Sequence, residues 1–196
     1  HHAGRTTVAV VGAGAGGVEL ALAMHYRLGR ELQAQGRAPD EVAVHLFSAG
    51  ADILPTHNRA VRHAFEGVLA ERGIAVHRDA EVVEVAPGQI KTRRGETLAA
   101  DEVVWVTQAG GAPWLAGTGL ALDEAGFIRV TDTLQTETDP RIFAAGDCAA
   151  MISRPLEKAG VFAVRMGPVL AENLRRAVLD QSLKAYQPQR RWLALI

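Results

Sequence analysis

A glycine-rich turn at the end of an apolar run constrains the fold of this chain more than any other feature. The run Val8–Val11 leads directly into Gly12-Ala13-Gly14-Ala15-Gly16-Gly17, a GxGxxG pattern. Beyond Gly17, apolar residues recur at helical spacing until about Gln35. A buried parallel strand, a tight turn and a helix therefore follow one another. This order is typical of a βαβ unit and predicts an α/β protein.

Each glycine of this turn has a separate physical role. Gly12 permits the tight turn, Gly14 lets the backbone approach a pyrophosphate, and Gly17 lets the helix pack against the sheet. Unpaired amides at the helix start, around Gly16, face the phosphate charge. The turn therefore predicts a binding site for a dinucleotide, with a plain tight turn as the alternative. A methyltransferase usually carries an acid two residues before the first glycine, where this chain has Val10.

The side chain that contacts the adenosine ribose is expected at the carboxyl end of the second strand. That strand is predicted over Val42–Phe47, so Ser48 occupies the position. A serine can bond a ribose hydroxyl but does not repel a 2′-phosphate, which leaves both NAD(H) and NADP(H) open. His57, Arg59 and Arg62 follow, and they are either phosphate contacts or solvated helix residues.

Helix and strand patterns alternate along the remaining sequence. Helices are predicted over residues 58–72 and 158–179, and strands over 74–76, 82–85, 89–91, 103–106 and 126–130. The apolar run over 142–145 is expected to be a further buried strand. The glycine-rich segment Thr107–Pro113 separates the two parts of the chain. We therefore expect one three-layer domain over residues 1–109 and another domain over 110–196.

Composition excludes several classes of protein. Lys and Arg total 21 against 22 Asp and Glu, so no basic field is present to attract nucleic acid. No apolar stretch approaches the ~18 residues that predict a membrane span. Cys148, the single cysteine, is interpreted as a semi-buried packing residue in a reducing, cytoplasmic compartment. The seven histidines show no metal-ligand spacing, so no metal site is predicted.

Three motifs together resemble one known superfamily. Gly12–Glu19 looks like the NAD(P)H-site fingerprint of the pyridine nucleotide-disulfide oxidoreductases. Thr107–Pro113 resembles their hinge from the NAD domain back to the FAD domain, and Thr138–Ala149 is similar to their second FAD motif. The stretch from Lys158 onward resembles the type II NADH dehydrogenase-like branch, in particular the flavoprotein module fused to selenide, water dikinase in some bacteria.

The resemblance implies roles for individual residues. Glu19 would lie near the nicotinamide, and in the first helical turn it would also stabilise the helix N-terminus. Gly110 in the hinge would lie against the cofactor, and Gly146 with Asp147 would meet the ribityl and pyrophosphate of FAD. In this superfamily the fingerprint for the ADP half of FAD lies upstream of the NAD turn. Residues 110–196 are therefore expected to be the C-terminal part of a second, Rossmann-like FAD domain.

The resulting hypothesis is a FAD-dependent NAD(P)H oxidoreductase, of which this chain is a part that is inactive alone. Hydride would pass from nicotinamide to flavin and then to an acceptor, with no catalytic protein side chain, because the cofactor carries the chemistry. Gly160 and Val164 replace glutamines that line the quinone site of type II dehydrogenases, which leaves the acceptor open. A selenophosphate synthetase domain, fused or separate, is the implied partner, and a homo-oligomer stays open. The alternative is a non-catalytic NAD(H)-binding or assembly module, which would show no flavin absorbance.

Overall fold

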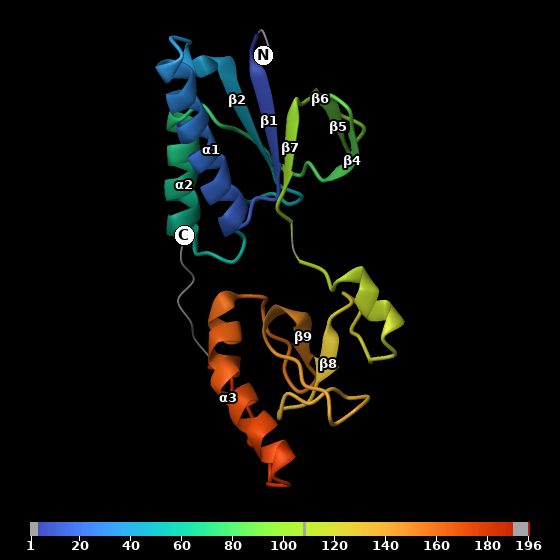
Figure 1. Ribbon diagram of the computed structural model, residues 1–196. Coiled ribbons are helices and arrows are strands. Elements are labelled where there is room, and N and C mark those ends of the chain that lie inside the picture. Colours follow the sequence, from blue (N-terminus) through green and yellow to red (C-terminus); the bar gives the residue numbers. More distant parts are fainter. Residues whose placement is uncertain (1–3, 108, 190–195) are drawn as a thin grey trace. The chain divides into compact units, whose positions relative to one another are not determined.

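The computed structural model describes residues 4–107, 109–189 and 196 and divides the chain into two compact units (Figure 1). The described residues up to Thr107, together with Ile196, form the first unit. Those from Ala109 to Gln189 belong to the second. Each unit has its own hydrophobic core, so each is described by itself.

A four-stranded parallel sheet forms the centre of the first unit. Its strands are β1 (Thr6–Val11), β2 (Val42–Phe47), β3 (Ala75–His77) and β7 (Glu102–Trp105). Their order in the sheet is β3-β2-β1-β7, so the glycine-rich strand β1 lies at the centre. Parallel strands end at the same edge of a sheet, and the turn after β1 therefore lies beside the segments after β2 and β7.

Different elements cover the two faces of this sheet, which makes three layers (Figure 1). Helices α1 (Ala15–Ala34) and α2 (Arg59–Glu71) cover one face, and a short 3₁₀ turn, η1 (Pro39–Glu41), precedes β2. The other face is covered by an antiparallel three-stranded sheet of β4 (Val82–Ala86), β5 (Gln89–Thr92) and β6 (Thr97–Ala99). This topology is Rossmann-like, with a small sheet as its third layer.

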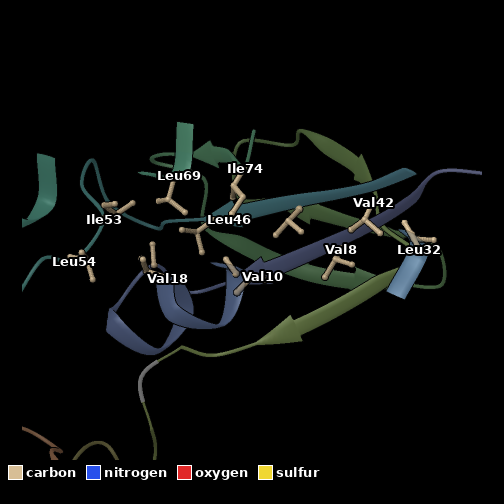
Figure 2. Packing of buried hydrophobic residues seen from close by; sticks show 13 residues of the cluster. Val8, Val10, Val18, Leu32, Val42, Leu46, Ile53, Leu54, Leu69 and Ile74 are labelled. Carbon is tan, nitrogen blue, oxygen red and sulfur yellow. The ribbon is translucent and has the colours of Figure 1, made fainter. Parts of the chain in front are cut away.

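Alternation along β1 explains why both faces must be covered. Val8 and Val10 point toward the helices, where they pack with residues such as Leu46 and Val18 (Figure 2). Residues Ala9 and Val11 point the other way, into the core under the antiparallel sheet. All four of these β1 side chains are buried, because successive strand residues face opposite sides. The uninterrupted apolar run of the sequence is the result.

The second unit contains less regular secondary structure than the first. Its elements are η2 (Pro113–Gly117), β8 (Ile128–Val130), η3 (Gly146–Cys148), β9 (Ala149–Met151) and α3 (Gly160–Val178). Strands β8 and β9 pair in parallel, and the core gathers around them and one face of α3. The unit is thus also α/β, with a parallel strand pair against a helix.

The predicted elements agree with the structure except in the short segments. The patterns for β1, β2, α1, α2 and α3 are confirmed to within about two residues at each end. The structure adds β6 and β9, which are three residues each and show no pattern of their own. The expectation of a strand over 142–145 was wrong. Phe143 makes only an isolated bridge to Gln135, and Ile142 is 42% exposed.

Candidate functional site

The first glycine of the turn is required by backbone geometry. Gly12 has φ +116°, a backbone angle that residues other than glycine rarely adopt. A Cβ atom at this position would lie 2.4 Å from the carbonyl oxygen of Val106. The Gly12 amide donates to the carbonyl of Phe47 at 3.0 Å. The turn is therefore held between the segments that follow β2 and β7.

The other glycines divide into one that is packed and two that are open. A Cβ atom on Gly17 would lie 1.7 Å from the carbonyl oxygen of Gly12, so only glycine lets α1 approach the turn. At Gly14 and Gly16, a Cβ atom would meet no atom within 4 Å. Gly14 is the N-cap of α1 and is exposed, and the first amides of a helix have no acceptor within it. The structure thus presents open space in front of amides that can bind an anion.

Ser48 lies at the predicted place but is buried. Its side chain is 5% exposed, and its hydroxyl donates to the carbonyl of Asp52 at 2.8 Å. Its amide donates to His77, and its carbonyl accepts from Ala80. Six residues further on, the Leu54 amide donates to the carbonyl of Ala13 at 2.7 Å. The loop after β2 is therefore tied to the glycine-rich turn itself.

A cluster of charged side chains lines a pocket beside this loop. Its lining residues are Asp52, Arg59, Arg62, His63 and Glu66. Arg62 forms an ion pair with Asp52, and Glu66 accepts from Arg78 at 2.7 Å. Arg59 is exposed as the first residue of α2 and has no side-chain partner among the described residues. The three basic residues named from the sequence are thus not equivalent: Arg62 is paired, Arg59 is open, and His57 is half-buried in the preceding turn.

Glu19 occupies a different position in its helix than expected. Helix α1 begins at Ala15, so Glu19 is its fifth residue, and the first turn contains no acid. The expectation that Glu19 stabilises the helix N-terminus from the first turn was wrong. Its side chain is exposed one turn behind Gly14 and Gly16. Its role toward nicotinamide stays a prediction.

Two histidines that the sequence did not single out form a pair on the sheet. The Nδ1 atom of His45 on β2 lies 2.9 Å from Nε2 of His77 on β3. The ring centroids are 5.2 Å apart and the planes differ by 20°, so the rings meet almost edge to edge in one plane. Burial lowers the pKa of both imidazoles below the ordinary value, and for His45 the neighbouring His77 and Arg5 add to this effect. Phe47 stacks on His77 with centroids 4.4 Å apart.

In the second unit, Gly146 and Asp147 form the short turn η3. Gly146 has φ +73°, and a Cβ atom there would lie 3.2 Å from Cβ of Ala163 on α3. The Asp147 side chain is exposed, and in the described part of the chain its carboxylate has no hydrogen-bond partner. Lys158 donates to the carbonyl of Ala149 at 2.6 Å, which keeps a positive charge close to this turn. Burial lowers the pKa of Lys158.

Cys148, in the same turn, is exposed. The interpretation as a semi-buried packing residue was therefore wrong. Its Sγ atom lies 3.3 Å from the carbonyl oxygen of Ala145. Cys148 is the last residue of η3 and directly precedes Ala149, the first buried residue of β9.

In the hinge, Gly111 is more tightly packed than Gly110, the glycine predicted to contact the cofactor. Gly110 is exposed, and a Cβ atom there would make an ordinary contact of 3.7 Å with the carbonyl of Ala125. At Gly111 the same atom would lie 1.8 Å from the carbonyl oxygen of Gly126. Only the fold could show this difference, because Gly126 is remote in sequence. The predicted cofactor contact of Gly110 stays a prediction.

Metal-ligand clusters and membrane-spanning helices are both absent from the described residues. Among them, no group of three or more His, Cys, Asp or Glu side chains is placed to hold a metal ion. Within the same residues, no helix is both long and apolar enough to cross a bilayer.

Residues 1–173 match the pyridine nucleotide-disulphide oxidoreductase family. This match covers most of the chain and includes both the turn at Gly12 and the turn at Gly146. The chain belongs to this family. The resemblance seen in the sequence motifs is thereby confirmed.

Two of the curated relatives carry names that refer to NADH. A type II NADH:quinone oxidoreductase of Haemophilus influenzae is 30% identical in an alignment of 193 residues that covers 93% of this chain and 43% of that protein. An NADH dehydrogenase-like protein of Mycobacterium tuberculosis is 33% identical over 146 residues, 74% of this chain and 36% of that protein. This member of the family therefore spans less than half the length of these relatives.

Solved structures show the same fold. A ferredoxin reductase from Rhodopseudomonas palustris superposes with a TM-score of 0.70 over 93% of this chain and 43% of its own, at 22% identity. Plasmodium falciparum NDH2 in complex with NADH superposes with a TM-score of 0.65 over 74% of this chain and 32% of its own, at 18% identity. The Rossmann-like α/β prediction is confirmed by this likeness.

Proposed function

We propose that this chain binds NAD(H) at the turn Gly12–Gly17 and is part of a FAD-dependent NAD(P)H oxidoreductase. In the complete protein, a bound nicotinamide would supply the hydride and a bound flavin would accept it, while the residues of this chain hold and orient the dinucleotide. The observation that carries the proposal is the open space in front of Gly14 at the start of α1. A pyrophosphate can approach amides there that no helical carbonyl satisfies.

The residues of the turn contribute in different ways. Gly12 and Gly17 shape the backbone, whereas Gly14 and Gly16 leave room for the ligand. Glu19, one turn further along α1, is proposed to face the nicotinamide end. The positive end of the helix dipole offsets part of the pyrophosphate charge. These groups bind and orient the dinucleotide, and the nicotinamide itself supplies the hydride.

The second unit supplies part of a site for FAD. Gly146 and Asp147 fit this role, because Asp147 presents an exposed carboxylate that can accept from ribityl hydroxyls. The flavin, when bound, supplies the two-electron acceptor for the hydride. Gly146 brings this turn against α3, and Lys158 fixes the backbone that follows it. Gly110 is proposed to lie against the cofactor from the hinge.

Domain boundaries and partners belong to the same proposal. Residues 1–109 are proposed as the NAD(P)H-binding domain and 110–196 as part of the FAD domain, in line with the two compact units. The stretch from Lys158 supports a selenophosphate synthetase domain, fused or separate, as a partner of the complete protein. Co-purification of the complete protein with that enzyme tests this last point.

The replacement of Gly14 by valine tests the site directly. A valine side chain would enter the space that the pyrophosphate needs, whereas its Cβ atom would meet no protein atom within 4 Å, so the variant is expected to fold. NADH affinity is expected to fall at least about tenfold, or ~1.4 kcal/mol. Calorimetric titration of wild type and variant measures this, with circular dichroism as the check on folding. Unchanged affinity in a folded variant would exclude the site.

A further inference from the structure

The carboxyl end of β2 needs a group that recognises the adenosine ribose, and Ser48 is poorly placed for it. Ser48 is 5% exposed, and its hydroxyl donates a hydrogen bond to the carbonyl of Asp52. Its backbone is bonded on both sides, to His77 and Ala80. A side chain with this burial and these partners stabilises the loop more readily than it contacts a ligand.

The same loop exposes a carboxylate four residues later. The Asp52 side chain is 55% exposed, and Arg62 from α2 forms an ion pair with its Oδ2 atom. No partner of Oδ1 is found among the described residues. Three hydrogen bonds to backbone carbonyls fix the loop: from the Ser48 hydroxyl to Asp52, from the Leu54 amide to Ala13, and from the Asp79 amide to Gly50. Asp52 is thus held on the edge where the glycine-rich turn lies.

The charges around Asp52 are nearly balanced. Arg62 is neutralised by Asp52, and Glu66 is neutralised by Arg78. Arg59 is the one cation of the pocket lining without a side-chain partner in the described residues. A 2′-phosphate brought to this edge would meet the Asp52 carboxylate at close range, whereas ribose hydroxyls would find an acceptor.

We infer that Asp52, positioned by Arg62, is the residue that selects NADH over NADPH. Its carboxylate accepts from the adenosine ribose hydroxyls and repels a 2′-phosphate. Ser48 contributes by holding the Asp52 backbone. This inference rests on the proposed NAD(H) site at Gly12–Gly17, because the ribose must lie beside the pyrophosphate.

The test is calorimetric titration of the purified 196-residue chain with NADH and with NADPH. Asp52→Asn removes the charge and leaves the bond from Ser48 intact, because that bond goes to the backbone. Asp52→Glu keeps the charge. Asp79→Asn is the matched control, since Asp79 is an exposed acid in the neighbouring loop whose φ of +49° asparagine also tolerates. Arg62→Met removes the group that holds Asp52.

Wild type is expected to bind NADH more tightly than NADPH. In Asp52→Asn, the NADH dissociation constant should rise about tenfold while that of NADPH stays equal or falls, which abolishes the preference. Asp52→Glu and Asp79→Asn should keep the preference, and Arg62→Met should weaken NADH binding a few-fold without strengthening NADPH.

Two results would overturn the inference. One is that the wild type prefers NADPH and that Arg62→Met abolishes this preference, which would make Arg62 a ligand of the 2′-phosphate. The other is equal effects of Asp52→Asn and Asp79→Asn. If NADH binding is lost in Gly14→Val but insensitive to Asp52, the proposed function stands and only this inference fails. If wild type binds neither dinucleotide, the proposed function fails with it.

Discussion

At the scale of single residues, the glycines of the first turn show that the same substitution can have very different effects at adjacent positions. Gly16 and Gly17 are adjacent in α1, yet a Cβ atom would meet no atom within 4 Å at Gly16 and would lie 1.7 Å from the Gly12 carbonyl at Gly17. The sequence pattern treats them alike, since both belong to GxGxxG. Packing against the turn separates them.

This difference gives a prediction for two alanine variants. Gly17→Ala should destabilise the fold by about 1–3 kcal/mol, because the helix or the turn must shift to admit the methyl group. Gly16→Ala should stabilise it by ~0.5–1 kcal/mol, because alanine is the better helix residue where space is open. Urea unfolding without ligand measures both. Similar free energies of unfolding for the two variants would contradict the packing described for Gly17.

At the scale of elements, Asn173 shows how α3 is fixed in the second unit. Its side chain is fully buried and makes three hydrogen bonds, donating to the carbonyls of Thr133 and Lys184 and accepting from the Lys184 amide. These bonds join the helix to two loops that precede and follow it. Asn173 therefore links α3 to these two loops by side-chain hydrogen bonds.

Replacement of Asn173 by alanine is expected to cost about 2–4 kcal/mol, because three part-buried hydrogen bonds are lost and a cavity is left at a fully buried side chain. Hydrogen exchange of the α3 amides and urea unfolding measure the loss. Leu174→Ala is the control, since Leu174 is the next residue of the helix and is 45% exposed. Equal effects of the two substitutions would mean that the hydrogen bonds of Asn173 contribute little.

The pair His45–His77 makes the β2–β3 edge of the sheet sensitive to pH. Both imidazoles have a pKa below the ordinary value of 6.5, chiefly through burial, while Glu96 opposes the shift for His77. Near pH 6.5 and below, the unfolded chain therefore binds more protons than the folded chain. The free energy of unfolding then falls as pH decreases, and it rises with pH through this window.

Urea unfolding of the chain at pH 7.5 and 5.5 should show lower stability at the acidic value. The variant with both histidines changed to valine, a residue that suits strands, should lose most of this difference. Lys91→Met, on the exposed side of β5, serves as the control because lysine does not titrate in this range. A double variant with the full wild-type pH dependence would place its origin elsewhere.

At the scale of the whole molecule, the two compact units correspond to the two proposed cofactor roles. The first unit contains the whole proposed NAD(H) turn, with a four-stranded sheet behind it. For FAD, the second unit offers chiefly Asp147, next to a two-stranded sheet. One or two hydrogen bonds at ~1 kcal/mol each do not offset the several kcal/mol lost when a ligand is immobilised.

We therefore expect the purified 196-residue chain to bind NADH but not to retain FAD. Its visible absorbance spectrum after gel filtration should lack a flavin band, even after incubation with FAD, and it should not oxidise NADH. The complete protein serves as the control and should show the band. Recovery of FAD at one molecule per chain would contradict this prediction and would mean that the second unit forms a full flavin site.

The sequence by itself determined the long elements and the glycine-rich turn between β1 and α1. The apolar run of β1, the helical period of α1 and α2, and the GxGxxG pattern are local signals, each complete within a few turns or a single strand. These patterns could be recognised without knowing which distant residues lie nearby in the fold. For the same reason the α/β class and the position of the linker near Gly110 followed from the order of these signals alone.

Only the tertiary structure decided which of the site residues are accessible and which are packed. Ser48 and Asp52 are both polar residues of one loop, and burial beside β3 separates them. Gly111 is constrained by Gly126, and His45 by His77, across distances along the chain that no periodic pattern encodes. The physical reason is common to all three cases. Burial, hydrogen bonding and steric contact depend on what lies nearby in space, and that is set by how strands and loops from separate parts of the sequence come together.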